Sequence, residues 1–166
     1  MRLTKQQHPY ATIISCSDSR VPPELIFDEG FGDLFVIRVA GHVVAHDTLG
    51  SLAYAADHLY TKLFVVMGHE GCGAVTAAVD SLLGQLKESE HIESLVNLIT
   101  PGLKQLNRRQ VRGELIKAAV EANVRWSMDQ VAHCPQVAKL LEAKLARLLG
   151  AVYELGTGRV RFLKPV

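Results

Sequence analysis

Three short apolar segments, rich in β-branched residues, are spaced along the first half of the chain, at 11–15, 34–39 and 63–67. Each has the length of a strand and few polar positions, which is typical of strands buried on both faces. Apolar positions recur with helical spacing over 49–59 and again over 74–82. Strands that alternate with helices in this way indicate a parallel α/β sheet.

The second half of the chain is predicted to be mostly helical, with proline and glycine at the boundaries. Pro101 ends a helix over 92–99, an amphipathic stretch follows from about 103 to 131, and Pro135 and Gly150 bound the last helix. The chain then closes in a predicted hairpin. The two strands of the hairpin are predicted over 151–155 and 160–163, and the turn between them is Gly156-Thr157-Gly158. We therefore predict one domain over residues 1–166, with a central, mostly parallel sheet of about four strands flanked by helices and a C-terminal edge strand or hairpin.

Composition narrows the class of protein. A length of 166 residues, 48% of them hydrophobic and 21% charged, suits one globular domain. The net charge of +1 argues against recruitment to nucleic acid or to a membrane surface. An apolar run of about 20 residues, as a membrane span needs, is missing, and the polar N-terminus has no apolar signal core. We expect a cytoplasmic protein. Three cysteines are an odd count for a disulfide framework and favour metal binding or free thiols.

Candidate metal ligands follow two of the predicted strands. Cys16 comes directly after the first strand, and His69 and Cys72 come after the third. The carboxyl ends of parallel strands meet at one edge of a sheet, so we expect these side chains to lie close together. Two thiolates and an imidazole suit Zn²⁺, and three protein ligands rather than four leave a position open for water or substrate. A lone cysteine is more often a small core residue, and we interpret Cys134 in that way.

Asp18 and Arg20 flank the first candidate ligand. They are two positions apart and share a side if the segment is extended. A bidentate pair would keep the carboxylate ionised and oriented for catalysis. Alternatively, the pair only fixes the loop, or Asp18 is itself the fourth zinc ligand and closes the site. The residues alone do not decide between these three roles.

Three ordered motifs are Cys16-Ser17-Asp18-Ser19-Arg20-Val21-Pro22-Pro23-Glu24, Gly32-Asp33-Leu34-Phe35-Val36-Ile37-Arg38-Val39-Ala40-Gly41 and Gly68-His69-Glu70-Gly71-Cys72-Gly73-Ala74-Val75. In these motifs, and over most of its length, the chain resembles the β-class carbonic anhydrases. The resemblance continues through Asn123-Val124-Arg125-Trp126 and the terminal hairpin.

The resemblance implies an enzyme that reversibly hydrates CO₂ to bicarbonate and a proton, by attack of zinc-bound hydroxide. One Zn²⁺ per chain would be held by Cys16, His69 and Cys72, with Asp18 and Arg20 as the catalytic dyad. The family also implies a homodimer or a dimer-based tetramer. Two alternatives are a CO₂-like substrate such as CS₂ or COS, and a zinc-binding module with a closed, inactive site.

Two features depart from the family pattern. His42 stands after the Ala-Gly of the second motif, where the family usually has Asn. A histidine near the mouth of the site would be able to pass protons to buffer, and the alternative is a surface histidine without a role. The family also has further N-terminal helices that pack on a partner subunit. Only about ten residues precede Ala11, so we expect the domain to lack this helical arm.

Overall fold

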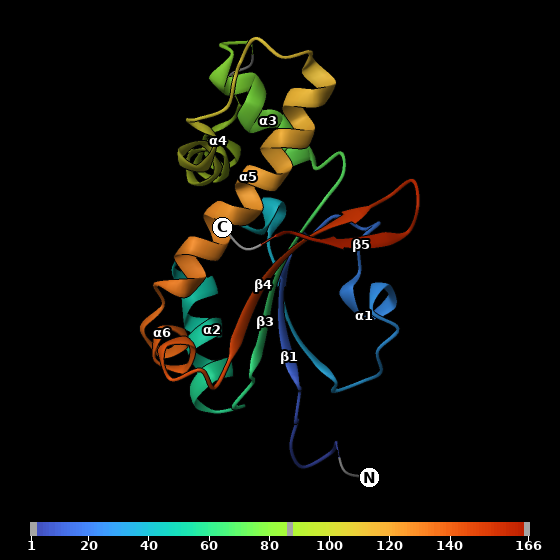
Figure 1. The fold of residues 1–166 in the computed structure, drawn as a ribbon, viewed down its shortest axis with the longest axis vertical. Helices are drawn as coiled ribbons and strands as arrows, with labels where there is room; N and C mark the ends of the chain where they lie inside the picture. Colours follow the sequence, from blue (N-terminus) through green and yellow to red (C-terminus); the bar gives the residue numbers. More distant parts are fainter. Residues whose placement is uncertain (1–2, 86–87, 165–166) are drawn as a thin grey trace.

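Five strands form one twisted sheet at the centre of the computed structural model, which describes residues 3–85 and 88–164 (Figure 1). Their order across the sheet is β2-β1-β3-β4-β5; the first four are parallel and β5 is antiparallel to β4. The strands are β1 (Ala11–Ser15), β2 (Leu34–Arg38), β3 (Leu63–His69), β4 (Arg147–Glu154) and β5 (Arg159–Phe162). The predicted α/β fold with a parallel sheet and a C-terminal hairpin is confirmed.

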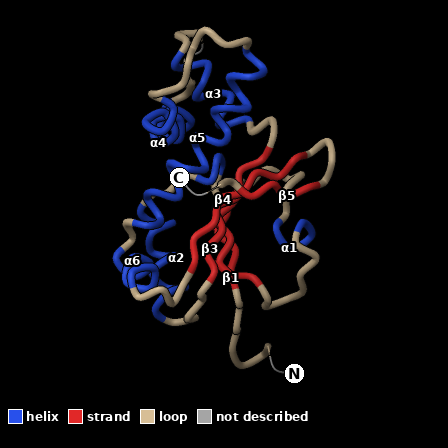
Figure 2. Tube along the Cα trace, viewed as in Figure 1, coloured by secondary structure: helices blue, strands red, loops and turns tan. Residues whose placement is uncertain are grey.

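The helices are divided unequally between the two faces of the sheet (Figure 2). Helices α2, α5 and α6 cover one face, α1 lies on the other, α3 packs against the far end of α5, and α4 packs against α3. The helices are α1 (Pro23–Ile26), α2 (His46–Asp57), α3 (Gly73–Leu82), α4 (Glu90–Ile99), α5 (Arg112–Ala132) and α6 (Pro135–Glu142), with 3-10 turns η1 (Ala40–His42) and η2 (Thr100–Leu103). None of the described helices has both the length and the apolarity that a membrane span needs.

Alternation along the strands divides the core into two clusters. In β3, Phe64 and Val66 face the larger cluster beneath the helices, whereas Val65 and Met67 face the smaller cluster on the α1 side. All four side chains are at most 3% exposed. Burial on both faces therefore explains why the strands are apolar at consecutive positions.

The helix boundaries in the second half of the chain differ from those predicted. The last helix ends at Glu142, and Gly150 lies inside β4 rather than after the helix. A Cβ at Gly150 would come within 2.4 Å of Met128 Sδ and 3.0 Å of Val124 Cγ1, so this glycine lets β4 approach α5 closely. The predicted amphipathic stretch from about 103 to 131 is helical only from Arg112.

A second close approach occurs where η2, which follows α4, packs against α5. Trp126 Nε1, on α5, donates a hydrogen bond to the carbonyl oxygen of Leu98 at 2.9 Å. A Cβ on Gly102, in η2, would lie 2.5 Å from Trp126 Cβ, which is too close to the α5 backbone to swing aside. This junction accordingly depends on the missing side chain of Gly102.

We expect Gly102→Ala to lower the free energy of unfolding by about 1–3 kcal/mol, because the added methyl overpacks the junction. The control is Gly113→Ala, an exposed position in α5 where an added Cβ meets nothing within 4 Å. Its helix propensity should leave stability unchanged or raise it by up to about 1 kcal/mol. Urea unfolding followed by circular dichroism measures both, and equal stabilities of the two variants would contradict this packing.

Candidate metal centre

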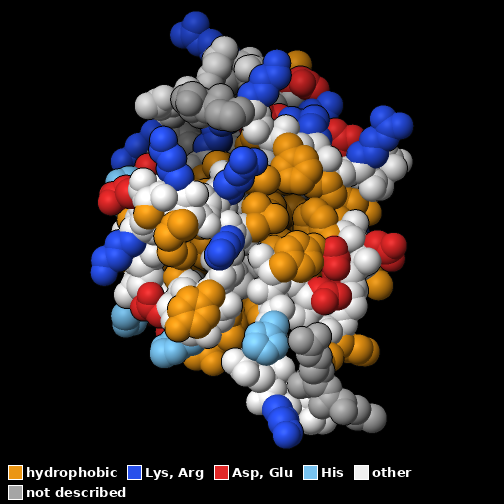
Figure 3. All heavy atoms as spheres, turned by 60° about the horizontal axis from the view of Figure 1, so that its bottom comes forward, with side chains coloured by type: hydrophobic (Ala, Val, Ile, Leu, Met, Phe, Trp, Pro, Cys, Tyr) orange, Lys and Arg blue, Asp and Glu red, His pale blue; other side chains and the backbone are white. Residues whose placement is uncertain are grey.

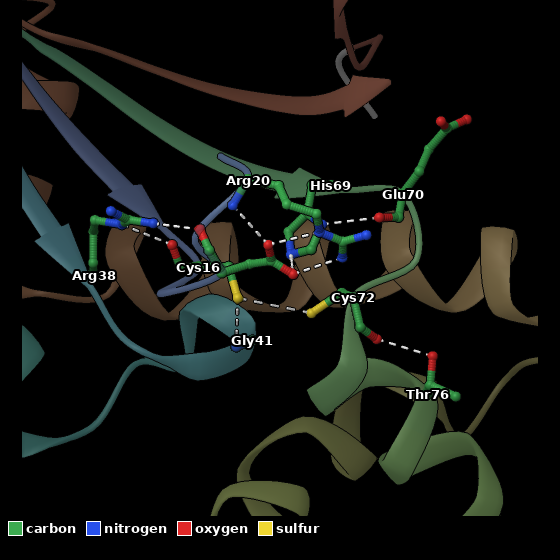
Figure 4. A network of polar contacts seen from close by, with 9 residues as sticks. Cys16, Arg20, Arg38, Gly41, His69, Glu70, Cys72 and Thr76 are labelled. Carbon is green, nitrogen blue, oxygen red and sulfur yellow. Dashed lines mark hydrogen bonds and ion pairs between the residues drawn. The ribbon is translucent and has the colours of Figure 1, made fainter. Parts of the chain in front are cut away.

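The three predicted ligands meet at the carboxyl ends of the parallel strands (Figure 4). Cys16 follows β1, His69 is the last residue of β3, and Cys72 directly precedes α3. Their ligand atoms all lie within 4.8 Å of one another, and the three residues are at most 5% exposed. Three buried donors converging in this way can hold a metal ion.

The imidazole of His69 presents a free lone pair to this group. Its Nδ1 lies 2.9 Å from the carbonyl oxygen of Glu70, which can only accept, so Nδ1 carries the proton and donates it. The opposite nitrogen, Nε2, is buried and has no hydrogen-bond partner among the described residues. A buried lone pair without a donor is costly, and a metal cation would satisfy it.

The two cysteine thiols also lie in an arrangement that a bound cation would stabilise. Cys16 Sγ and Cys72 Sγ are 3.9 Å apart, and the hydrogen bond between them lowers the pKa of Cys16 while it raises the pKa of Cys72. The pair on its own therefore keeps one proton. A positive ion between the sulfurs would allow both to be thiolates.

Asp18 and Arg20 meet through a turn rather than through an extended segment. The backbone N–H of Val21 donates to the Asp18 carbonyl oxygen at 3.1 Å, which closes the turn. The Asp18 carboxylate accepts bonds from Arg20 Nε at 2.9 Å, from Arg20 Nη2 at 2.7 Å and from the Arg20 backbone N–H at 2.9 Å. These side-chain bonds are the main reason that the pKa of Asp18 lies well below its usual range.

The carboxylate lies beside the ligand group. Asp18 Oδ2 is 3.8 Å from His69 Nε2, and the Asp18 side chain is 18% exposed. It therefore stands between the buried donors and the solvent, where it would be able to contact a molecule bound to an ion held by these donors. Arg20 is more exposed, at 54%, and its hydrogen bonds within the described part of the chain run to Asp18.

Arg38 contacts the loop that carries Cys16 and Asp18, a contact that the sequence did not predict. At the end of β2, it donates through Nε to the Cys16 carbonyl oxygen at 2.9 Å and through Nη2 to the Asp18 carbonyl oxygen at 2.6 Å. One guanidinium thereby fixes the loop that carries both a ligand and the acidic residue. An arginine at the end of an apolar strand was the available signal, because β2 pairs with β1 in register.

His42 is placed differently from both earlier expectations. It is 1% exposed, so it is neither at the mouth of the site nor on the surface. Burial lowers its pKa to about 4, which removes it as a proton carrier at neutral pH. Cys134 is buried away from the ligand group, with its Sγ 3.6 Å from Gln136 Oε1, as a structural cysteine should be.

Comparison with known proteins places this fold and site in one enzyme family. The sequence model of the carbonic anhydrase family matches residues 11–160. A carbonic anhydrase of Mycolicibacterium smegmatis is 36% identical over 159 residues, which cover 95% of this chain and 76% of that protein. Carbonic anhydrase 2 of Mycobacterium tuberculosis is 35% identical over 161 residues, which cover 95% and 75%.

Solved structures with a similar fold are carbonic anhydrases of the β class. The Coccomyxa β-carbonic anhydrase in complex with acetazolamide superimposes with a TM-score of 0.88 at 27% identity, covering 99% of this chain and 77% of that one. A tetrameric β-carbonic anhydrase of Sordaria macrospora shares the fold, with a TM-score of 0.86 at 23% identity over 99% of this chain and 85% of that one. The chain belongs to the β-carbonic anhydrase family, a family of enzymes.

We expect Cys72→Ser to lose most of its bound metal, because a serine hydroxyl stays protonated and is a much weaker ligand than a thiolate. Cys134→Ser is the matched control and should retain the wild-type content of about one ion per chain. Inductively coupled plasma mass spectrometry of the purified proteins measures both. Wild-type metal content in Cys72→Ser would contradict the ligand assignment.

Proposed function

We propose that this chain is a zinc-dependent carbonic anhydrase, which converts CO₂ and water reversibly into bicarbonate and a proton. The observation that carries the proposal is the buried group of Cys16, His69 and Cys72 with the paired carboxylate of Asp18 beside it. Membership of the β-carbonic anhydrase family supplies the reaction class.

Zinc is the metal that these donors fit best. Tetrahedral ligation with Zn–S bonds of about 2.3 Å separates two sulfurs by about 3.8 Å, and the sulfurs of Cys16 and Cys72 are 3.9 Å apart. Thiolate and imidazole together favour Zn²⁺ over the hard cations Mg²⁺ and Ca²⁺. Three protein ligands leave a fourth position for water, which is typical of catalytic zinc.

Each residue then has a distinct role. Bound zinc would supply Lewis acidity, which lowers the pKa of a water molecule so that it loses a proton and can attack CO₂ at neutral pH. Asp18 would accept a hydrogen bond from the attacking oxygen and so orient a lone pair of that oxygen toward the substrate. Arg20 holds Asp18 in place and keeps it charged, since the pKa of this carboxyl is far below neutral. Arg38 fixes the loop that carries Asp18.

A second copy of the chain is the partner that we propose. Hydrophobic side chains gather in one broad area of the surface in Figure 3, and among the described residues α1, four residues long, is the only helix on the face of the sheet opposite α2, α5 and α6. A tetrameric relative shares the fold. Sedimentation should give the mass of a dimer or a dimer-based tetramer, and the mass of one chain would contradict this.

We also propose a reducing location such as the cytoplasm, since all three cysteines are free thiols.

We expect Asp18→Asn to lower kcat for CO₂ hydration by about 100-fold or more while zinc stays bound, because the neutral amide has one acceptor oxygen in place of two and cannot both pair with Arg20 through two bonds and accept a hydrogen bond from the water. Stopped-flow CO₂ hydration of the zinc-loaded protein measures this, with metal content determined on the same sample. Asp57→Asn, an exposed change at the end of α2, is the control and should keep full activity.

The same assay separates the alternatives. Full activity in Asp18→Asn would remove Asp18 from the mechanism. A wild-type protein that binds zinc but hydrates no CO₂ at any pH would be a closed zinc module. Hydrolysis of CS₂ or COS without CO₂ hydration would replace the proposed substrate with a CO₂-like one.

A further inference from the structure

Three buried polar side chains beside the metal centre have no part in the mechanism above. His42, in η1, lies against Asn123 and Ser127, which are one turn apart on α5. Each of the three is 1% exposed. Buried polar groups are usually hydrogen-bonded, and every polar atom of these three side chains has a partner among the described residues except Asn123 Oδ1. The pattern of the bonds that are made shows what the side chains hold in place.

The bonds among the three residues fix the tautomer of His42. Asn123 Nδ2 lies 3.4 Å from His42 Nε2, and an amide nitrogen can only donate, so Nε2 is the acceptor. The proton is therefore on Nδ1, which lies 3.2 Å from Ser127 Oγ and donates to it. The Ser127 hydroxyl in turn donates to the carbonyl oxygen of His42 at 3.3 Å. Burial keeps the imidazole neutral, with its pKa lowered to about 4.

The network stabilises the backbone of Gly41 and His42, which has an unfavourable conformation. Gly41 and His42 have φ angles of 63° and 45°, in the left-handed region. For a histidine this conformation costs roughly 1–2 kcal/mol. Gly41 is also confined, because an added Cβ would lie 2.8 Å from Ile99 Cδ1 and 3.1 Å from Ala74 Cβ. Such a conformation persists only where the surroundings fix it.

Gly41 connects this network to a ligand of the metal centre. Its carbonyl oxygen accepts a hydrogen bond from Asn123 Nδ2 at 2.9 Å. Its N–H donates to Cys16 Sγ at 3.3 Å (Figure 4). The amide of Asn123 and the sulfur of Cys16 thus bind opposite ends of one residue, and a shift of the first would be passed to the second.

We infer that Asn123 is a positioning residue of the metal centre: it holds Gly41 so that the Gly41 N–H stays bonded to Cys16 Sγ, while His42 and Ser127 orient the Asn123 amide. The inference rests on the proposed metal site. A hydrogen bond to a thiolate withdraws negative charge from sulfur, and partners of this kind tune how strongly a ligand donates to the metal. In a site with two thiolates, that withdrawal would favour a more acidic bound water.

Asn123→Leu tests this, because leucine matches the branched shape of asparagine and removes the donor. We expect zinc affinity, measured by competition with a chromophoric chelator, to fall about ten-fold. In the protein loaded with Co²⁺, the thiolate-to-cobalt absorption should move to longer wavelength, because the sulfur loses a hydrogen bond. Ser127→Ala, which removes the partner of His42 Nδ1, should change both quantities in the same direction by less.

The matched control is Thr61→Val. Thr61 is 1% exposed and shares a buried hydrogen bond of 2.8 Å with Thr12, at the opposite end of β1 from the ligands. It should lower stability but leave zinc affinity and the cobalt spectrum unchanged. If Asn123→Leu fails to fold by circular dichroism, Ser127→Ala decides the matter.

The results separate the two proposals. Wild-type zinc affinity and an unchanged cobalt spectrum in the folded network variants would overturn the role of Asn123. A shifted spectrum in the Thr61→Val control would overturn it as well. A wild-type protein that binds zinc without hydrating CO₂ would contradict the proposed function, and the spectra would still decide the role of Asn123.

Discussion

The pairing of β1 with β3 is the constraint on which the metal centre depends. Ser15 is paired with Met67 in a parallel register, so Cys16 leaves β1 beside the end of β3, where His69 stands. A slip of one residue would turn every side chain of β1 to the other face of the sheet and would carry Cys16 away from the other donors. Hydrophobic burial on both faces, with Ile13 and Ile14 each at most 2% exposed, fixes the register and thereby the site.

Much of this arrangement could be predicted because it depends on local patterns. The apolar segments ending at Cys16 and His69 mark two parallel strands, and a parallel sheet brings their carboxyl ends together without further information. The role of Gly150 could not be predicted, because it depends on a contact with a residue far away in the sequence. Its local sequence resembles the end of a helix, whereas its role is to leave room for Met128 of a distant helix.

The burial of His42 could not be predicted either, because it also depends on residues far away in the sequence. The residue is polar and follows a glycine, which is typical of an exposed turn. Its burial results from α5, which supplies Asn123 and Ser127 from more than eighty positions along the chain. Gly68 has a related role, since an added Cβ would lie 2.7 Å from Val124 Cγ2 and 3.2 Å from His42 Nε2. Contacts of such long range leave no periodicity in the sequence.

The surroundings of Asp18 bear on whether the fourth position of the metal is open. Backbone and side-chain groups of Arg20 together occupy both carboxylate oxygens, and Arg38 binds the carbonyl oxygen of Asp18. An exposed ion pair alone would hold the carboxylate weakly, since Arg20 is screened by water. The turn adds backbone bonds that water does not replace without opening the loop. Oδ1 accepts two of the bonds from Arg20 and Oδ2 accepts one, so a lone pair of Oδ2 stays free beside the ligand group, 3.8 Å from His69 Nε2. With that lone pair Asp18 can accept a hydrogen bond from a water molecule while it keeps every charge-assisted bond to Arg20, and this geometry favours a fourth position that is left to water.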